Sequence, residues 1–161
     1  MMEIKLTKGK TALINDGDFG QLNKFRWYCN HYGYAVREKY FGMMNGKRKR
    51  SCVWMHREIL KTPNGLFTDH INGDRLDNRR ENLRMATNQQ NKANEGLRKT
   101  NTSGYKGVTW DKDREKWMAQ IMFGGKHIWI AHCKTRQEAA KKYDQAAINY
   151  FGSFAKLNFV V

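Results

Sequence analysis

The stretch TDHINGDRLDNRRENLRMATNQQNKANE, residues 68–95, decides how this chain is organised. It starts with Asp69 and His70 after a short apolar run. A polar loop follows, in which Asn-Gly and Asp-Asn dipeptides favour turns. Residues 83–86 then have the composition of a returning strand. The first three predicted elements are therefore strand, loop and strand.

The end of the same stretch carries the signal for a helix. Thr87, followed three residues later by Gln90, forms a capping box, which predicts a helix with Asn91 in its first turn. The stretch also holds the densest cluster of Asp, Asn and His in the chain. Oxygen-rich clusters of this kind are typical of sites for hard cations.

The charge is distributed unevenly around this stretch. The 161 residues include 30 Lys and Arg against 15 Asp and Glu, which gives a net charge of +15. Residues 1–68 contribute +8, residues 69–100 only +2 and residues 101–161 +5. Such an excess favours a polyanionic partner. The near-neutral middle holds the candidate metal site, and the two basic flanks can hold that partner.

The composition excludes several classes of protein. Hydrophobic residues make up 40% of the chain and there is a single proline, which excludes a disordered basic tail. No apolar run approaches the roughly 18 to 20 residues of a membrane helix, so we expect no membrane partner and a protein that acts in the cytoplasm. Cys29, Cys52 and Cys133 are odd in number and far apart, which fits neither a disulfide framework nor paired zinc ligands.

Residues 1–62 have the pattern of short strands. Asn45 and Gly46 favour a two-residue hairpin turn, because both positions accept positive φ. The alternating positions on either side of this turn are Tyr34, Val36, Cys52, Trp54 and His56. A basic run begins the returning strand and consists of Lys47, Arg48, Lys49 and Arg50. It is either a solvated hairpin tip or a phosphate-binding one, and the total charge favours phosphate binding.

The C-terminal part indicates a second unit. Residues 96–104 are polar and without periodicity, which predicts a linker. Short strand-like segments follow, with aromatic side chains at Tyr105, Trp110, Trp117 and Trp129. Thr135 and Glu138 then form a second capping box, and Gly152 stands where a helix stop belongs.

Residues 68–95, with Asp69-His70, Asn82 and Asn91 at their observed spacing, resemble the ββα-metal fold of HNH endonucleases. The segment MHREIL at 55–60 is similar to that family's upstream segment. The resemblance implies that His70 is the general base and that Asp69 and Asn91 hold one divalent cation, Mg²⁺ or Mn²⁺. It implies that Asn82 ties the loop to its neighbours. Many family members carry His at the position of Asn91, so the amide favours a hard cation over zinc.

Strand geometry adds two expectations for this site. Asp69 and His70 are adjacent on a strand, so their side chains point to opposite faces unless the strand bends. We therefore expect a twist or bulge there. A general base also needs a fixed tautomer, so we expect a backbone carbonyl to hold the second ring nitrogen of His70.

Residues 103–159 resemble the Apetala, or ethylene-response-factor, DNA-binding domain. The signature pieces are YKGV, KWMAQI, EAAKKYDQAAI and FAKLNF. The resemblance implies a three-stranded antiparallel sheet that enters the DNA major groove, with a helix packed behind it. Arginines common in plant members are replaced at Thr109, Met122 and His127, so the base preferences of plant domains do not transfer.

Alternation along these strands assigns their faces. Lys106, Trp110 and Lys116 are predicted to face DNA. The residues predicted to face the helix are Val108, Ala119 and Ile121. At least one of the three tryptophans in this region is expected in the core.

We therefore predict an α+β chain with an N-terminal strand region and HNH unit in residues 1–95, a linker in 96–104 and an Apetala-type domain in 105–161. The predicted function is that of a phage- or intron-encoded homing endonuclease that hydrolyses phosphodiester bonds of double-stranded DNA. The alternatives are a DNA-binding regulator that uses the HNH unit as a scaffold and, less favoured, an RNA-binding protein. One active site per chain predicts a monomer that nicks, and two-strand cleavage requires a dimer or a second site.

Overall fold

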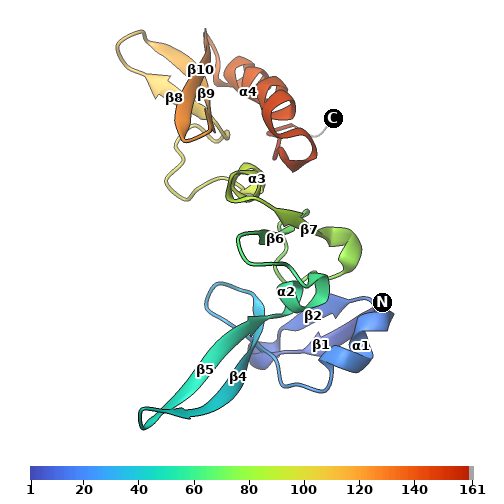
Figure 1. Cartoon of the computed structure of the whole chain (residues 1–161). Coiled ribbons are helices and arrows are strands. Elements are labelled where there is room, and N and C mark those ends of the chain that lie inside the picture. Colours follow the sequence, from blue (N-terminus) through green and yellow to red (C-terminus); the bar gives the residue numbers. More distant parts are fainter. Residues whose placement is uncertain (160–161) are drawn as a thin grey trace. The chain divides into compact units, whose positions relative to one another are not determined.

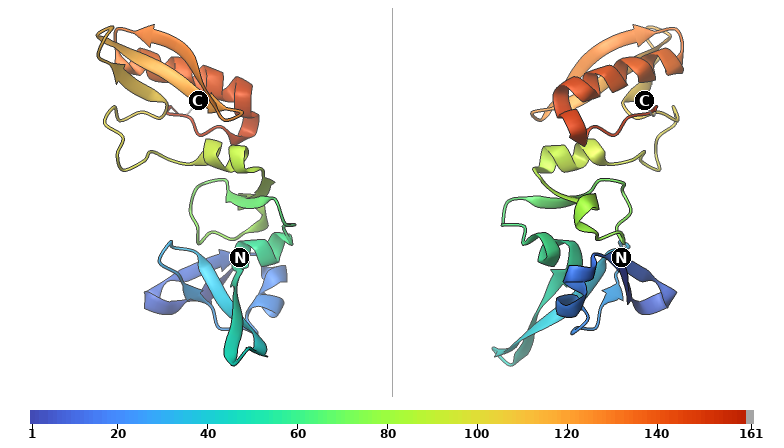
Figure 2. Two further views of the ribbon diagram at one scale, coloured as in Figure 1. Left: turned by 60° about the vertical axis from the view of Figure 1, so that its left-hand side comes forward. Right: turned by 90° about the vertical axis from the view of Figure 1, so that its right-hand side faces the viewer.

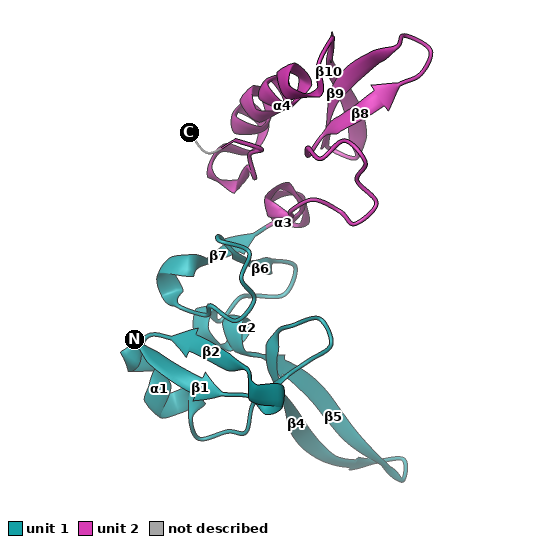
Figure 3. Cartoon of the chain, turned by 180° about the vertical axis from the view of Figure 1, so that it is seen from behind, with its two compact units in different colours: residues 1–86 teal, residues 87–161 magenta. Residues whose placement is uncertain are grey.

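The chain has the predicted α+β fold, and the computed structural model describes residues 1–159 (Figure 1). It divides into two units, residues 1–86 and 87–161 (Figure 3). This boundary falls just before the helix that the sequence predicts at Thr87. The domain ends proposed at 95 and 105 stay a prediction, and the last two residues of the proposed C-terminal domain lie outside the described part.

The first unit consists of three antiparallel sheets and short helices. Its sheets are the pair β1-β2, the three strands β3-β4-β5 and the pair β6-β7. In chain order its elements are β1 (Met2–Lys5), η1 (Thr7–Gly9), β2 (Thr11–Ile14), α1 (Asp16–Leu22), β3 (Tyr28–Cys29), β4 (Ala35–Met44), β5 (Lys47–Trp54), α2 (Met55–Leu60), β6 (Phe67–His70), η2 (Arg80–Asn82) and β7 (Leu83–Ala86).

The predicted hairpin at Asn45-Gly46 is confirmed. Asn45 has φ 51° and Gly46 φ 70°, the two positive values that a tight turn between twisted strands requires. β4 and β5 extend from it as a long ribbon that reaches beyond the rest of the first unit (Figure 1). One extra residue of β4 enters the ladder between Tyr40 and Met43, where Gly42 has φ 94°.

The prediction of short strands in residues 1–62 holds for β1 to β5 but is wrong at two places, where α1 and α2 are helices. The MHREIL segment forms α2, so His56 lies on a helix and not on the returning strand. Met55 and Ile59, one helical turn apart, are both buried in the core of this unit, which makes the helix the conformation that packs. The core cluster comprises Ile4, Ala12, Ile14, Leu22, Trp27, Ala35, Met55, Ile59 and Leu83.

In the second unit one long helix covers a three-stranded antiparallel sheet, and a short helix precedes the sheet in the chain. The sheet order is β10-β9-β8, and α4 packs along it (Figure 2). The elements are α3 (Asn88–Asn94), β8 (Val108–Asp111), β9 (Lys116–Phe123), β10 (Lys126–Cys133), α4 (Arg136–Phe151) and η3 (Gly152–Phe154). Both predicted capping boxes are present, at Thr87 and at Thr135.

The core of the second unit contains the residues predicted to face the helix, but the prediction that Trp110 faces DNA from the other side is wrong, because Trp110 stands two residues from Val108 and its ring contacts Trp117 on the same face. The residues predicted to face the helix, Val108, Ala119 and Ile121, are buried together with Tyr143 of α4. Trp117 packs partly against this cluster, whereas Trp110 and Trp129 are exposed. The expectation that at least one tryptophan belongs to the core is therefore confirmed. Within residues 1–159, no helix combines the length and the apolar composition needed to cross a bilayer.

Candidate functional site

β6 presents Asp69 and His70 at its end, opposite β7. The register of the two strands is continuous, with Asp69 opposite Arg84 and His70 opposite Leu83. No bulge interrupts this ladder, so of the two expected distortions only a twist of the strand stays a prediction. Both side chains are buried, and His70 is the last residue of β6 before the loop.

The carboxylate of Asp69 is buried and paired with a cation. The side chain of Arg84 donates from Nε to Asp69 Oδ2 at 2.8 Å, and its Nη2 lies 2.8 Å from the same oxygen. A buried carboxylate without such a partner would be costly, so Arg84 stabilises the negative charge that the site keeps. Sequence analysis missed Arg84, which the strand register reveals because it stands directly across from Asp69.

The imidazole of His70 is buried in a cluster of rings. Its centroid lies 5.1 Å from that of His56 and 5.9 Å from that of Tyr34. Burial lowers the pKa of His70 below its ordinary value of 6.5, although the hydrogen bond to Asn78 acts in the opposite direction. His70 is therefore neutral at pH 7, which is the protonation state that a general base needs.

One ring nitrogen of His70 contacts a side-chain amide, and the expected backbone carbonyl stays a prediction. Nε2 of His70 lies 3.4 Å from Oδ1 of Asn78, which is fully buried. Because an amide oxygen accepts a hydrogen bond, this contact favours the tautomer that is protonated on Nε2. Asn78 is a second residue that sequence analysis missed, since its only sequence signal was that of a turn.

Hydrogen bonds of Asn82 join the two ends of the loop between β6 and β7. Its Oδ1 accepts from the backbone N–H of Asn72 at 3.0 Å, and its Nδ2 donates to the carbonyl of Asp77 at 2.8 Å. Its carbonyl also accepts from the N–H of Ile71 at 2.9 Å. These contacts are of the kind expected for Asn82, and they hold the loop that carries Asn78.

β2 supports the same loop from outside. The N–H of Leu13 donates to the carbonyl of Leu76, and the carbonyl of Leu13 accepts from the N–H of Asn78, both at 2.8 Å. Farther along the loop, the carboxylate of Asp77 accepts from Nε and Nη2 of Arg79 at 2.7 Å, which lowers the pKa of Asp77. The N-terminal strands therefore fix the position of Asn78, in addition to any contact they make with DNA.

The four site residues fall in different parts of the chain. The first unit holds Asp69, His70 and Asn82, whereas Asn91 lies in α3 of the second unit. No group of three or more His, Cys, Asp or Glu side chains within residues 1–159 could hold a metal ion. A set of one carboxylate and one amide does not depend on such a group, and its oxygen atoms suit a hard cation.

The residues predicted to bind DNA differ in their surroundings. Trp110 and Lys116 are exposed on the second unit, and the basic run of β5 is exposed at the ribbon. Arg50 of that run is paired with Glu38 at 2.6 Å. Lys106 instead directs Nζ at the last carbonyls of α3, including that of Glu95 at 2.6 Å. Burial lowers the pKa of Lys106 to about 8, so its ammonium group is mostly charged at pH 7 and caps the helix end.

Comparison with known proteins finds a family match in each of two parts of the chain. Residues 61–93 match the model of an HNH endonuclease, and residues 103–153 match that of the AP2 domain. An uncharacterized HNH endonuclease of Acanthamoeba polyphaga mimivirus is 31% identical over 157 residues, which is 94% of this chain and 76% of that protein. This chain belongs to the HNH endonuclease family.

Two further relatives match parts of this HNH protein. Protein 3.8 of Escherichia phage T7 is 35% identical over 91 residues, or 56% of the chain and 74% of the phage protein. The ethylene-responsive transcription factor WRI1 of Arabidopsis thaliana is 31% identical over 108 residues, which is 66% of the chain but only 24% of the plant protein. The combination of an HNH unit with an AP2 domain supports a nuclease or DNA-binding role, with duplex DNA as partner.

Proposed function

We propose that this HNH protein is a metal-dependent homing endonuclease that hydrolyses phosphodiester bonds of duplex DNA at a recognised site. The observation that carries the proposal is the neutral, buried His70 beside Asp69 at the end of β6. A neutral imidazole held by Asn78 can take the proton of the attacking water at physiological pH. We further propose that the protein acts as a monomer in the cytoplasm of a host cell and is encoded by a phage or an intron.

The remaining residues serve to hold and orient. Asp69 and Asn91 would bind one Mg²⁺ or Mn²⁺, which supplies charge stabilisation for the scissile phosphate and the leaving 3′-oxygen. Arg84 holds the Asp69 carboxylate in place through the ion pair at 2.8 Å. Asn82 holds the loop that carries Asn78, and this keeps Asn78 beside His70.

The AP2-type domain is proposed to anchor the protein on DNA. Its sheet exposes Lys116 on the face opposite the core, and Trp110 is exposed at the edge of the core face. The ribbon of the first unit exposes Lys47, Arg48 and Lys49. Lysine and arginine side chains in such positions neutralise phosphates without reading sequence. Lys106 remains a proposed DNA contact, although its ammonium group already donates to carbonyls of α3.

One observation favours a second candidate, a DNA-binding regulator. Asp69 already has a cationic partner in Arg84, and an ion pair of this kind can be purely structural. A regulator would bind DNA without cutting it. The two candidates therefore differ in a single measurable activity.

The test is the nicking of supercoiled plasmid in Mg²⁺, in Mn²⁺ and in EDTA. We expect nicking with either cation and none in EDTA, and DNA binding without nicking in all three buffers would favour the regulator. His70→Ala should lower the rate by about 10² to 10⁴ and leave DNA affinity within a few-fold. The control Lys141→Ala, at an exposed side chain of α4 on the other side of the sheet, should nick normally. Comparable cleavage by His70→Ala would remove it as the base.

The metal ligands require a separate titration. Asp69→Asn and Asn91→Ala should each raise the Mg²⁺ concentration that gives half-maximal nicking. The first variant removes the charge of a ligand, and the second removes an oxygen ligand. Asp69→Asn keeps the shape of the side chain opposite Arg84, so the fold can be compared by circular dichroism. An unchanged metal requirement in both variants would exclude the two residues as ligands.

A further inference from the structure

One face of the β4-β5 ribbon leads from its tip to the site of His70. Residues directly opposite in an antiparallel pair share a face, and every second pair lies on the same side. The pairs on this face are Met43–Arg48, Tyr40–Arg50, Glu38–Cys52 and Val36–Trp54. The carboxylate of Glu38 is neutralised by Arg50 at 2.6 Å. This face, which we call the ribbon face, is therefore basic near the tip and aromatic at its base.

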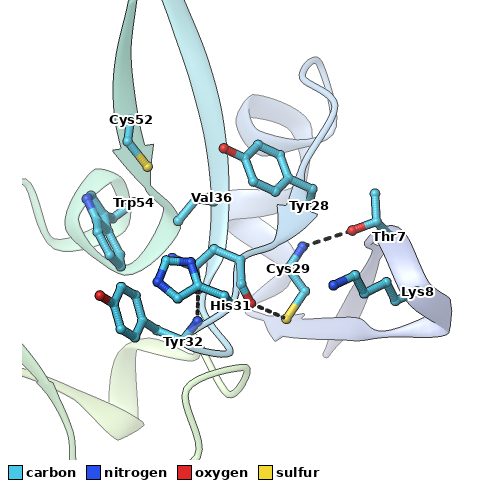
Figure 4. Close-up of a pocket in the computed structure, with 10 residues that line it drawn as sticks. Thr7, Lys8, Tyr28, Cys29, His31, Tyr32, Val36, Cys52 and Trp54 are labelled. Carbon is cyan, nitrogen blue, oxygen red and sulfur yellow. Dashed lines mark hydrogen bonds between the residues drawn. The ribbon is translucent and has the colours of Figure 1, made fainter.

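A cavity of about 750 Å³ lies at the base of the ribbon face (Figure 4). Trp54, Tyr32 and His31 form one side of it, with the rings of His31 and Tyr32 only 3.7 Å apart between centroids. Val36 and Cys52 add an apolar wall. Burial and the nearby Glu38 raise the pKa of the Cys52 thiol, so this sulfur is uncharged at pH 7 and does not act as a nucleophile.

The opposite side of the cavity carries a positive charge. Lys8 approaches from η1, with its amine directed toward the rings (Figure 4). The backbone of Lys8 has φ 61°, a conformation that non-glycine residues rarely adopt. The turn is fixed to the sheet because Thr7 Oγ1 accepts from the N–H of Cys29 at 3.2 Å. The backbone of Lys8 is thus fixed at the edge of an aromatic cavity.

Trp54 connects the wall of the cavity with the ring cluster around His70. Trp54 lies 5.8 Å from His56, and His56 lies 5.1 Å from His70, between ring centroids. Arg75, from the loop that carries Asn78, donates to the carbonyl of Tyr32 at 2.6 Å. The cavity and His70 therefore share one cluster of packed rings in the first unit.

We propose that the cavity binds one unstacked nucleobase of the DNA strand that occupies the His70 site. The aromatic faces of Tyr32 and Trp54 offer stacking surfaces, which accept any base because every base has a π-face. Lys8 and Arg75 supply positive charge for the adjoining phosphates. The volume is within the range of small-ligand sites. This inference rests on the proposed function, because it takes DNA to be the substrate.

The test compares two duplexes of the same sequence, one fully paired and one with a single bulged thymidine. Binding is measured in EDTA, so that no hydrolysis occurs. In the bulged duplex the cost of unstacking a base is already met, and a stacked base contributes on the order of a five-fold or greater gain in affinity. We expect the full chain to bind the bulged duplex tighter by at least roughly that factor.

Two matched tyrosine variants locate the effect. Tyr32 is 59% exposed in the cavity wall, and Tyr40 is 56% exposed on the same ribbon face outside the cavity. Tyr32→Ala should abolish the preference for the bulged duplex, whereas Tyr40→Ala should keep it. Because both side chains are exposed, both variants should fold, and a thermal melt confirms this. No preference in the native chain, a preference kept in Tyr32→Ala or one lost in both variants overturns the proposal.

Crosslinking gives a second readout that does not depend on affinity. With 5-iodouracil at the bulged position, irradiation should link the DNA to the peptide containing Tyr32 or Trp54, and a link confined to other peptides overturns the proposal. The outcome is separable from the proposed nuclease activity. Nicking without bulge preference would reject the cavity alone, whereas bulge preference without nicking would reject the nuclease and leave the cavity as a DNA subsite.

Discussion

Among single residues, His56 combines deep burial with an unsatisfied polar atom. It is 6% exposed, and its Nδ1 has no hydrogen-bond partner among the described residues. Its ring lies between those of Tyr34, Trp54 and His70. Burial, with help from His70 and Arg57, lowers the pKa of His56 to about 3. The ring that packs against the proposed general base is therefore uncharged throughout the physiological range.

This depressed pKa predicts a loss of stability in acid. Between pH 6.5 and about 3 the unfolded chain binds a proton at His56 that the folded chain does not, so stability falls as pH falls. The slope from one such group reaches about 1.4 kcal/mol per pH unit. His56→Gln should unfold with a shallower pH dependence in chemical denaturation between pH 7 and pH 5. Identical slopes for the variant and the native chain would contradict the assignment.

At the level of elements, the sheet and helix of the second unit meet at Gly107. It has φ 73°, and a Cβ placed there would lie 1.9 Å from the ring of Tyr143 in α4. The glycine of the YKGV signature is thus required for two reasons, the positive φ of its backbone and the close approach of a core ring. The ring of Tyr143 is buried and cannot move aside without disturbing the core cluster.

A pair of glycine variants separates these two requirements. Gly104 has φ 80° but no atom within 4 Å of an added Cβ. Gly104→Ala should cost about 1 kcal/mol of stability, from backbone strain alone. Gly107→Ala should cost about 2 to 4 kcal/mol, because overpacking is added to the strain. Thermal unfolding followed by circular dichroism measures both, and equal losses would show that the Tyr143 contact is unimportant.

For the whole molecule, the excess of positive charge on both flanks determines how DNA binding responds to salt. The basic run of β5 and the exposed Lys116 of β9 belong to different units. If both contact phosphates, affinity falls with salt along a log-log line whose slope is about −0.9 for each phosphate neutralised. The slope therefore gives the number of phosphate contacts, and it can be measured without knowing the target sequence.

Charge-removing variants test this distribution. Lys116→Gln should make the slope shallower by about 0.9, and the same holds for each of Lys47, Arg48 and Lys49 that contacts a phosphate. Lys141→Gln removes an equally exposed charge from α4, the helix on the other side of the sheet, and should leave the slope unchanged. Fluorescence anisotropy across a salt series gives the slopes. An equal effect of Lys116→Gln and Lys141→Gln would mean that the sheet does not face DNA.

The sequence alone determined the features whose signals lie within a few residues. The capping boxes at Thr87 and Thr135 and the turn at Asn45 are of this kind, because each depends on hydrogen bonds or φ values inside one turn. Residues 68–95 also indicated the HNH family, since its residues stand at fixed spacing within one short motif. α2 escaped prediction because six residues are too few to show a helical period.

Tertiary structure alone decided which groups surround His70 and where charges are paired. Arg84 reaches Asp69 across a strand pair, Asn78 reaches His70 across a loop, and Arg75 reaches the carbonyl of Tyr32 from 43 positions away. Such contacts leave no local pattern, because a side chain's partner is set by strand register and packing and not by its neighbours in sequence. For the same physical reason Lys106, which the sequence analysis predicted to contact DNA, directs its ammonium group to the end of α3.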